Sequence, residues 1–256
     1  MRYYTSIRLK RDEVEDFDRY PFSIPAIRNL DEIDLDENVT FIIGENGAGK
    51  STLIEAVAVR LGFNPEGGSK NFNFATRESH SELSTKLVVP RTPEKPTDGY
   101  FLRAESFYNV ASELERLDDP AYKAPPLTDA YGGKGLHEQS HGESFFSLLN
   151  YRLTGGGFYI FDEPEAALSP QRQLAMLTIM HRLIYHRSQL LIATHSPIIM
   201  AYPNATIYQL TDDKIEQVEY KDTEHYQITK TFLDCPERML HHLLTEEDNY
   251  LLDLER

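Results

Sequence analysis

The feature that most constrains this chain is one glycine-rich stretch, Gly44-Glu45-Asn46-Gly47-Ala48-Gly49-Lys50-Ser51-Thr52, which fits the pattern G-x-x-x-x-G-K-[ST]. An apolar run at 39–43 precedes it, as expected of a buried strand, and apolar residues at helical spacing follow it. Glycines let such a loop wrap closely around a phosphate, and amide hydrogens at the helix start point at it. We therefore expect Lys50 to bridge the outer phosphates of a nucleotide and the Ser51 hydroxyl to hold Mg²⁺. The residues expected to bind nucleotide here are Gly44, Asn46, Gly47, Ala48, Gly49, Lys50, Ser51 and Thr52.

Length and composition indicate an ordinary globular protein. The 256 residues suffice for one large α/β domain or for a domain with an inserted lobe, and 40% are hydrophobic. No apolar run of about 18 residues suggests a membrane span. Cys235 is the only cysteine, and the first residues lack the apolar core of a secretion signal, so we expect a cytoplasmic protein.

The net charge of −15 argues against a protein that coats DNA, because phosphate contacts need clustered Lys and Arg. The segment Arg8-Leu9-Lys10-Arg11 is a candidate for a local basic patch. A solvated strand edge is the commoner explanation for such a segment.

Two carboxylates, Asp162 and Glu163, end a second apolar run at 158–161. Buried strands seldom end on charges without a partner, and Mg²⁺ is one such partner. We expect Asp162 to hold Mg²⁺ through water and Glu163 to act as general base for the attacking water. The alternative is a pair of carboxylates that merely begins a loop, but a phosphate loop upstream favours the functional interpretation.

A third apolar run at 189–194 ends on His195. A lone histidine is more often structural, but ligands of open α/β sheets bind at the carboxyl ends of parallel strands, so His195 is expected to reach a γ-phosphate. Ser169 is expected to begin a helix at 171–187. An aromatic side chain near the start of the chain, Phe22 or Tyr20, could stack on the base, although a core role is commoner for either.

Strands are also predicted at 83–89 and 100–104, and a hairpin at 206–220. A small helical lobe is expected at about 107–153. Within it, Ser140 and Glu143 form a capping box, which accounts for both residues structurally. A helix start with Gly142 is also a possible second anion site.

Four elements occur in order, namely the phosphate loop, Ser140-His141-Gly142-Glu143, Ile160-Phe161-Asp162-Glu163 and Thr194-His195-Ser196. In that order they resemble the ATP-binding-cassette (ABC) class of P-loop ATPases, and most of all its soluble branch, which includes the heads of chromosome-maintenance (SMC) and RecF-type ATPases. Segments 101–107, 140–144 and 222–227 are similar to a family of small bacterial AAA/ABC-type ATPases that consist of little more than the head. The resemblance implies a single α/β P-loop domain over 1–256, with a mixed sheet, N-terminal antiparallel strands and the small helical lobe.

The resemblance also implies a mechanism, in which two heads pair head to tail around ATP and Mg²⁺. Each nucleotide is then held from two sides. The Lys50 loop of one subunit binds it, and so does the helix start of the other subunit, which contains Ser140 and Gly142. Lys50, Glu163 and His195 carry catalysis, and Ser169 lies in the turn that signals across the dimer.

Two departures from the ABC pattern concern the half of the site that the second subunit supplies. The usual Leu-Ser-Gly-Gly-Gln signature is altered at Gln139, His141 and Glu143. The Gln that senses Mg²⁺ is not evident; Glu105 lies near its place and either replaces it as a metal ligand or pairs with Arg103.

Three functions remain open on the sequence. The first is a soluble ATPase whose ATP-dependent homodimer acts on DNA or on a partner such as a nuclease, in DNA maintenance or defence. The second is the ATP-binding subunit of a membrane transporter, and the third is a nucleotide-gated interaction module with little turnover.

Overall fold

The computed structural model describes residues 2–70, 82–105 and 145–244. Contacts divide the chain into two compact units, Met1–Val218 and Glu219–Arg256. Every predicted site residue belongs to the first unit. None of the helices within the described ranges is long and apolar enough to cross a membrane.

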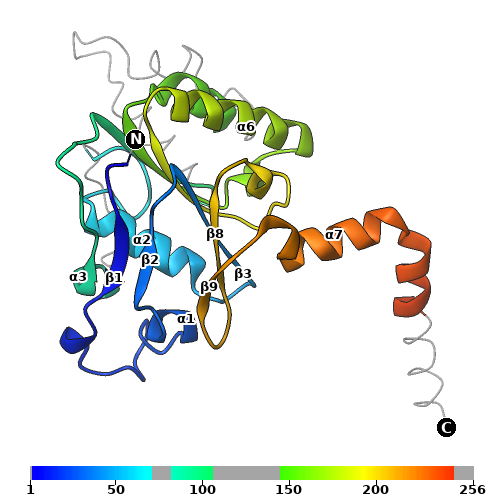
Figure 1. Ribbon diagram of the computed structural model, residues 1–256, viewed down its shortest axis with the longest axis horizontal. Coiled ribbons are helices and arrows are strands. Elements are labelled where there is room, and N and C mark those ends of the chain that lie inside the picture. Colours follow the sequence, from blue (N-terminus) through cyan, green and yellow to red (C-terminus); the bar gives the residue numbers. More distant parts are fainter. Residues whose placement is uncertain (1, 71–81, 106–144, 245–256) are drawn as a thin grey trace, which may run out of the picture. The chain divides into compact units, whose positions relative to one another are not determined.

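The larger sheet of the first unit has six strands in the order β5-β6-β7-β3-β8-β9 (Figure 1). They are β3 (Val39–Gly44), β5 (Asp98–Arg103), β6 (Gly157–Asp162), β7 (Gln189–Ala193), β8 (Thr206–Leu210) and β9 (Ile215–Val218). All pairs are parallel except β8 with β9, which form the predicted hairpin. Every residue of β3, β6 and β7 is buried, which explains why these strands are continuously apolar rather than alternating.

The smaller sheet is antiparallel and has the order β2-β1-β4. Its strands are β1 (Ser6–Leu9), β2 (Glu32–Asp34) and β4 (Leu87–Val88). The prediction of a strand at 83–89 was wrong for its first half, because Leu83–Lys86 forms the single helical turn α3. Leu83 and Leu87 are both fully buried, and the i, i+4 spacing places two residues on one face of a helical turn as well as of a strand, so this pattern does not distinguish the two.

Helix α2 (Lys50–Arg60) packs between the two sheets. Its buried side chains, such as Leu53 and Val57, belong to the same core cluster as Ile7 of β1 and Ile160 of β6. On the other side of the large sheet lies α6 (Pro170–Tyr185), whose buried residues recur at helical spacing (Figure 1). The shorter helices of this unit are η1 (Arg11–Glu13), α1 (Pro25–Arg28), η4 (Leu148–Arg152), η5 (Pro164–Ala167) and η6 (Ile199–Ala201).

One side chain, that of Gln189 at the start of β7, ties the amino-terminal segment to the central sheet. Its Oε1 accepts hydrogen bonds from the backbone N–H groups of Tyr3 (2.8 Å) and Tyr4 (3.0 Å). Its Nε2 donates to the carbonyl oxygens of Tyr4 (2.9 Å) and Leu35 (3.3 Å). The oxygen and the nitrogen of this buried side-chain amide therefore each form two hydrogen bonds to backbone groups.

The predicted helical lobe falls mostly outside the described residues. Of the part that is described, residues 145–147 are helical and continue into η4, a π-helical turn. Arg152 in that turn forms an ion pair with Asp98 at 3.0 Å and so fixes it to the start of β5.

The second unit is helical in its described part. It contains η7 (Tyr220–Asp222), α7 (Glu224–Asp234) and a further helical run at 236–244. The Thr223 hydroxyl accepts from the backbone N–H of Tyr226 at 3.3 Å and caps α7.

Candidate active site

The glycine-rich loop joins the end of β3 to the start of α2, as the motif predicts. Gly47 and Gly49 have φ angles of +86° and +96°, in the left-handed region that favours glycine. A Cβ atom at Gly49 would lie 2.8 Å from Cγ2 of Ile24, so the loop also requires glycine there for lack of space. The backbone thus curls back over the first turn of α2, whose amide groups are free of intrahelical partners.

The side chain of Lys50 is buried and lies inside this curl. Its Nζ donates to the carbonyl oxygens of Gly44 (3.0 Å) and Glu45 (2.9 Å). Burial lowers the pKa of Lys50, and the carboxylates of Glu163 and Asp162 oppose that effect. Two neutral carbonyl oxygens therefore hold the ammonium group. The charged oxygens of a bound phosphate would take their place and form stronger hydrogen bonds.

Ser51 and Asp162 meet across the gap between α2 and β6. The Ser51 hydroxyl donates to Oδ1 of Asp162 at 3.0 Å, although the two residues are 111 positions apart. Asp162 is only 4% exposed, and burial raises its pKa to about 6, against the lowering effect of the neighbouring Arg103. A hydroxyl and a carboxylate in contact are the oxygen ligands that Mg²⁺ takes from a protein when phosphates supply the rest.

Arg103 lies beside Asp162 because the two residues are opposite each other in the β5–β6 register. Its Nε is 3.4 Å from Oδ2 of Asp162, and its Nη1 is 2.7 Å from Glu55 of α2. Glu105, a predicted alternative metal ligand, has a side chain that is 82% exposed and lies 3.9 Å from Arg103. The pairing of Glu105 with Arg103 is thus observed, and a metal-binding role of Glu105 stays a prediction.

Glu163 and His195 lie next to each other at the ends of the adjacent strands β6 and β7. Oε1 of Glu163 is 3.4 Å from Nε2 of His195. Glu163 has a φ angle of +49°, uncommon for a residue with a side chain, and such strain is frequent at functional sites. Both side chains are about one-third exposed, although the Nε2 atom of His195 that faces Glu163 is itself buried.

A further carboxylate, Glu165, belongs to this cluster although sequence reasoning did not single it out. It accepts hydrogen bonds from the backbone N–H of His195 and from the side chain of Thr194, and burial raises its pKa. The only signal in the sequence was a third acid close behind the predicted pair. Ser169 stands at the N-cap of α6 as predicted, but its side chain makes no capping hydrogen bond.

The remaining predicted residues are Ser140, Gly142, Phe22 and Tyr20. Ser140 and Gly142, the predicted second half of the site, lie outside the described residues. The Phe22 ring is only 3% exposed and packs into the core, so it cannot stack on a base, whereas Tyr20 is 64% exposed. Ile24, four residues beyond Tyr20, touches the phosphate loop, so this segment borders the site.

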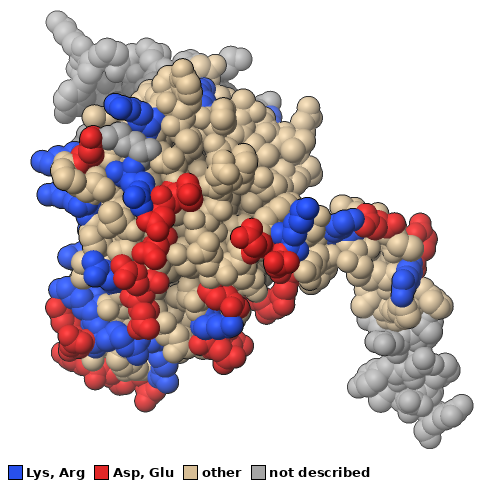
Figure 2. Space-filling view, in the orientation of Figure 1, with Lys and Arg blue, Asp and Glu red and all other residues tan. Residues whose placement is uncertain are grey.

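The candidate basic patch at Arg8, Lys10 and Arg11 is largely neutralised. These three cations pair with Glu32 (3.3 Å), Glu13 (2.7 Å) and Asp31 (3.8 Å), respectively. Figure 2 shows Lys and Arg intermixed with Asp and Glu over the face that carries the small sheet. The segment therefore has the character of a solvated strand edge rather than of a phosphate-binding surface.

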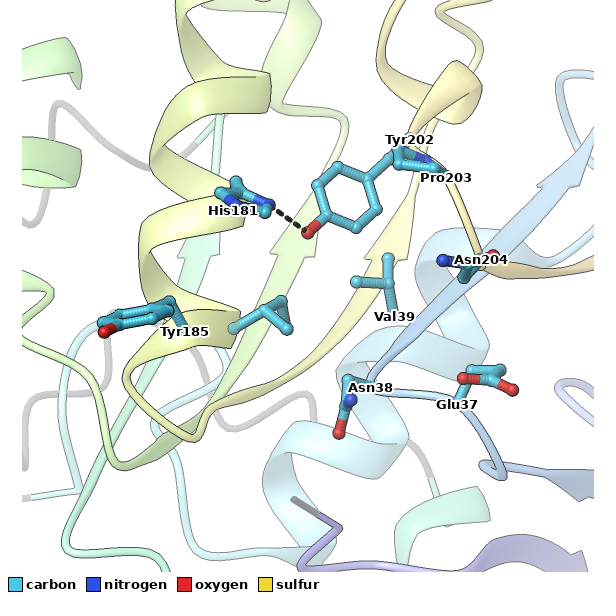
Figure 3. A pocket seen from close by; sticks show the side chains of 9 residues that line it. Glu37, Asn38, Val39, His181, Tyr185, Tyr202, Pro203 and Asn204 are labelled. Carbon is cyan, nitrogen blue, oxygen red and sulfur yellow. Dashed lines mark hydrogen bonds between the residues drawn. The ribbon is translucent and has the colours of Figure 1, made fainter.

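A cavity of about 400 Å³ lies away from this cluster, at the start of β3 (Figure 3). There the Tyr202 hydroxyl lies 3.4 Å from Nδ1 of His181. Since Gly44 ends the same strand, the cavity and the loop are separated by about 17 Å of extended chain. The residues that line the cavity are Glu37, Asn38, Val39, His181, Ile184, Tyr185, Tyr202, Pro203 and Asn204, none of them a predicted site residue.

Two models of known domain families match the chain. One, described as an AAA domain, matches residues 19–116. The other, described as "AAA domain, putative AbiEii toxin, Type IV TA system", matches residues 144–201. No curated protein matches this chain in sequence.

Solved structures with a similar fold include an ATP-binding cassette of an ABC transporter, which is 16% identical, with 90% of this chain and 99% of that chain covered and a TM-score of 0.50. The SMC head domain from Thermotoga maritima is 17% identical, with 86% and 100% covered and a TM-score of 0.45. The cbiO1 subunit of an ABC transporter complex from Clostridium perfringens is 20% identical, with 84% and 90% covered and a TM-score of 0.46. At such identities the likeness concerns the fold alone. The loop geometry and the strand order are those of an α/β P-loop fold, and the two domain models, each of which covers less than half of the chain, match AAA domains.

Proposed function

We propose that this protein binds ATP with Mg²⁺ at the Lys50 loop and hydrolyses it to ADP and phosphate. The observation that carries the proposal is the 3.0 Å hydrogen bond between Ser51 and Asp162, which brings the loop and the acid-ended strand to one point. Oxygen ligands, a curled amide-lined loop and a buried ammonium group together fit a triphosphate and its metal. Bound Mg²⁺ would neutralise charge on the phosphates during transfer.

Each residue then has a role that follows from its position. Lys50 exchanges its two carbonyl partners for phosphate oxygens, and Ser51 and Asp162 would hold Mg²⁺, Asp162 through water. Glu163 takes a proton from the water that attacks the γ-phosphorus, as the bond to the bridging oxygen of ADP breaks. His195, 3.4 Å from Glu163, donates a hydrogen bond to the γ-phosphate. The exposed Tyr20 stacks on the base.

We further propose that ATP joins two copies of the chain head to tail, with Ser140 and Gly142 of one copy completing the site of the other. The similarity to cassettes and to an SMC head supports this arrangement only through the shared fold. The cellular role that fits best is action on a partner protein in defence or DNA maintenance, since the description of the second domain match names a toxin system. The paired cations of the small sheet favour a protein partner over DNA.

Nucleotide binding is tested by calorimetry with ATP and Mg²⁺ on Lys50→Ala. Lys214→Ala is the matched control, because it removes the same charge from a side chain that is 60% exposed and pairs with Glu216. We expect the affinity of Lys50→Ala for ATP to fall at least about 30-fold, as for a lost charge-assisted contact, and the control to match the wild type. Equal affinities in the two variants would refute the assignment of the site.

The partner is tested by measuring phosphate release with and without duplex DNA. We expect no stimulation by DNA. Strong stimulation would favour DNA over a protein as the substrate, and recovery of a membrane-spanning protein in pull-downs would favour the transporter function.

A further inference from the structure

The turn that follows β7 carries His195, and its conformation depends on a side chain from a different turn. Glu165 lies in η5, directly after β6, and its carboxylate accepts the backbone N–H of His195. It also accepts a hydrogen bond from the side chain of Thr194, which is fully buried. The two turns are 30 residues apart in the chain, yet one carboxylate joins them.

The hydrogen bonds continue beyond Thr194. Its Oγ1 accepts the backbone N–H of Ser196 at 3.0 Å, and the Ser196 hydroxyl in turn accepts the N–H of Ile199 at 3.1 Å. Three consecutive residues, Thr194 to Ser196, are therefore oriented by one connected network that ends on Glu165. A buried carboxylate is costly unless hydrogen-bond donors offset that cost. The turn supplies two donors, the N–H of His195 and the hydroxyl of Thr194, whereas Oε2 of Glu165 is buried without a hydrogen-bond partner among the described residues.

A further carboxylate near a phosphate site is unfavourable on charge alone. Asp162 and Glu163 already place two acids near Lys50, and Glu165 adds a third to the same surroundings. A role other than ligand binding therefore suits this carboxylate better. The geometry supplies one, because the carboxylate faces the backbone of His195, and the His195 ring lies 3.4 Å from Glu163.

We propose that Glu165 is a positioning residue, which holds the His195 turn so that the imidazole stays beside Glu163 and in reach of the γ-phosphate. This inference rests on the proposed ATP hydrolysis. It adds that Glu165 acts only through His195. Displacing a catalytic group by about 1 Å can lower a rate about 100-fold, so a lost anchor is expected to affect kcat rather than nucleotide affinity.

The test is a double-mutant cycle on the full chain, with Glu165→Ala, His195→Ala and the two combined. We expect Glu165→Ala to lower kcat about tenfold or more while the Kd for ATP changes less than about threefold. In the His195→Ala background the same change should cost less than about twofold, because the group it positions is already gone. Glu165→Gln retains an oxygen acceptor for the His195 N–H and should restore most of kcat.

The outcomes separate the two levels of the argument. If the wild type hydrolyses ATP and the losses of the two single variants multiply, Glu165 acts independently of His195 and the inference is wrong. The inference is also wrong if Glu165→Gln is as slow as Glu165→Ala. If the wild type does not hydrolyse ATP at all, the proposed function fails, and this inference fails with it.

Discussion

Replacing Asp162 by asparagine should make the nucleotide-free protein more stable at neutral pH. Burial raises the pKa of Asp162 from 3.8 to about 6, so the folded protein binds this proton more tightly than the unfolded chain does. Its contribution to stability is therefore fully present below pH 3.8 and is lost as the pH rises to about 6. The asparagine side chain carries no charge and still accepts the hydrogen bond from Ser51.

The expected gain in the free energy of unfolding follows from the pKa shift of Asp162. About two pKa units at 1.36 kcal/mol each correspond to about 3 kcal/mol at pH 7.5, and the same calculation leaves about 1 kcal/mol at pH 4.5. No discount for solvent screening is needed, because the side chain of Asp162 is only 4% exposed. For a chain of this length, about 3 kcal/mol corresponds to a rise in Tm of roughly 6–12 °C.

The assay is urea unfolding followed by circular dichroism, without nucleotide and with a chelator present. The control is Glu105→Gln, which removes the same charge from a neighbouring carboxylate that is 82% exposed. We expect a change of less than about 0.5 kcal/mol for that control. An Asp162→Asn protein less stable than the wild type at pH 7.5, or a gain independent of pH, would refute the argument.

Three further predictions concern the loop, the base and the sheet junction. Gly49→Ala should lower the free energy of unfolding by about 2 kcal/mol, measured in urea, because a Cβ atom strains the left-handed backbone and meets Ile24. Tyr20→Ala should weaken ATP binding about tenfold in calorimetry, as for a lost stacking contact, and leave the free energy of unfolding unchanged. Phe22→Ala should instead lower the free energy of unfolding by about 3 kcal/mol. The opposite pattern would exclude Tyr20 as the stacking residue. Gln189→Ala should cost about 3 kcal/mol in urea unfolding, since buried backbone groups of the amino-terminal segment lose their partners; a loss under about 1 kcal/mol would mean that water replaces the amide.

Much of the central site could be predicted because its parts are encoded locally. The phosphate loop is read from glycines at fixed spacing, and the apolar runs before Gly44, Asp162 and His195 mark buried strands. Parallel strands of one sheet end at the same edge, so three such ends were expected to meet. The observed register, with Asp162 opposite Ala193, places them there.

Other features depend on contacts between distant segments and leave little trace in a local pattern. Glu165 is one acid among several until the turns after β6 and β7 are brought together. Gln189 is a polar residue at the start of an apolar run, and only the folded chain brings it to the backbone of Tyr3 and Tyr4. The single turn of α3 was mistaken for a strand because four residues are too few to show a helical period.

The most direct test of the proposed activity is single-turnover and steady-state phosphate release by Glu163→Gln, measured beside its affinity for ATP. The side chain keeps its shape but no longer accepts a proton, so we expect ATP to bind with wild-type affinity while hydrolysis falls at least about 100-fold. Size-exclusion chromatography with ATP should then show a persistent dimer. Phosphate release at the wild-type rate by Glu163→Gln would contradict the account, because the proposed mechanism assigns removal of the proton from the attacking water to the Glu163 carboxylate.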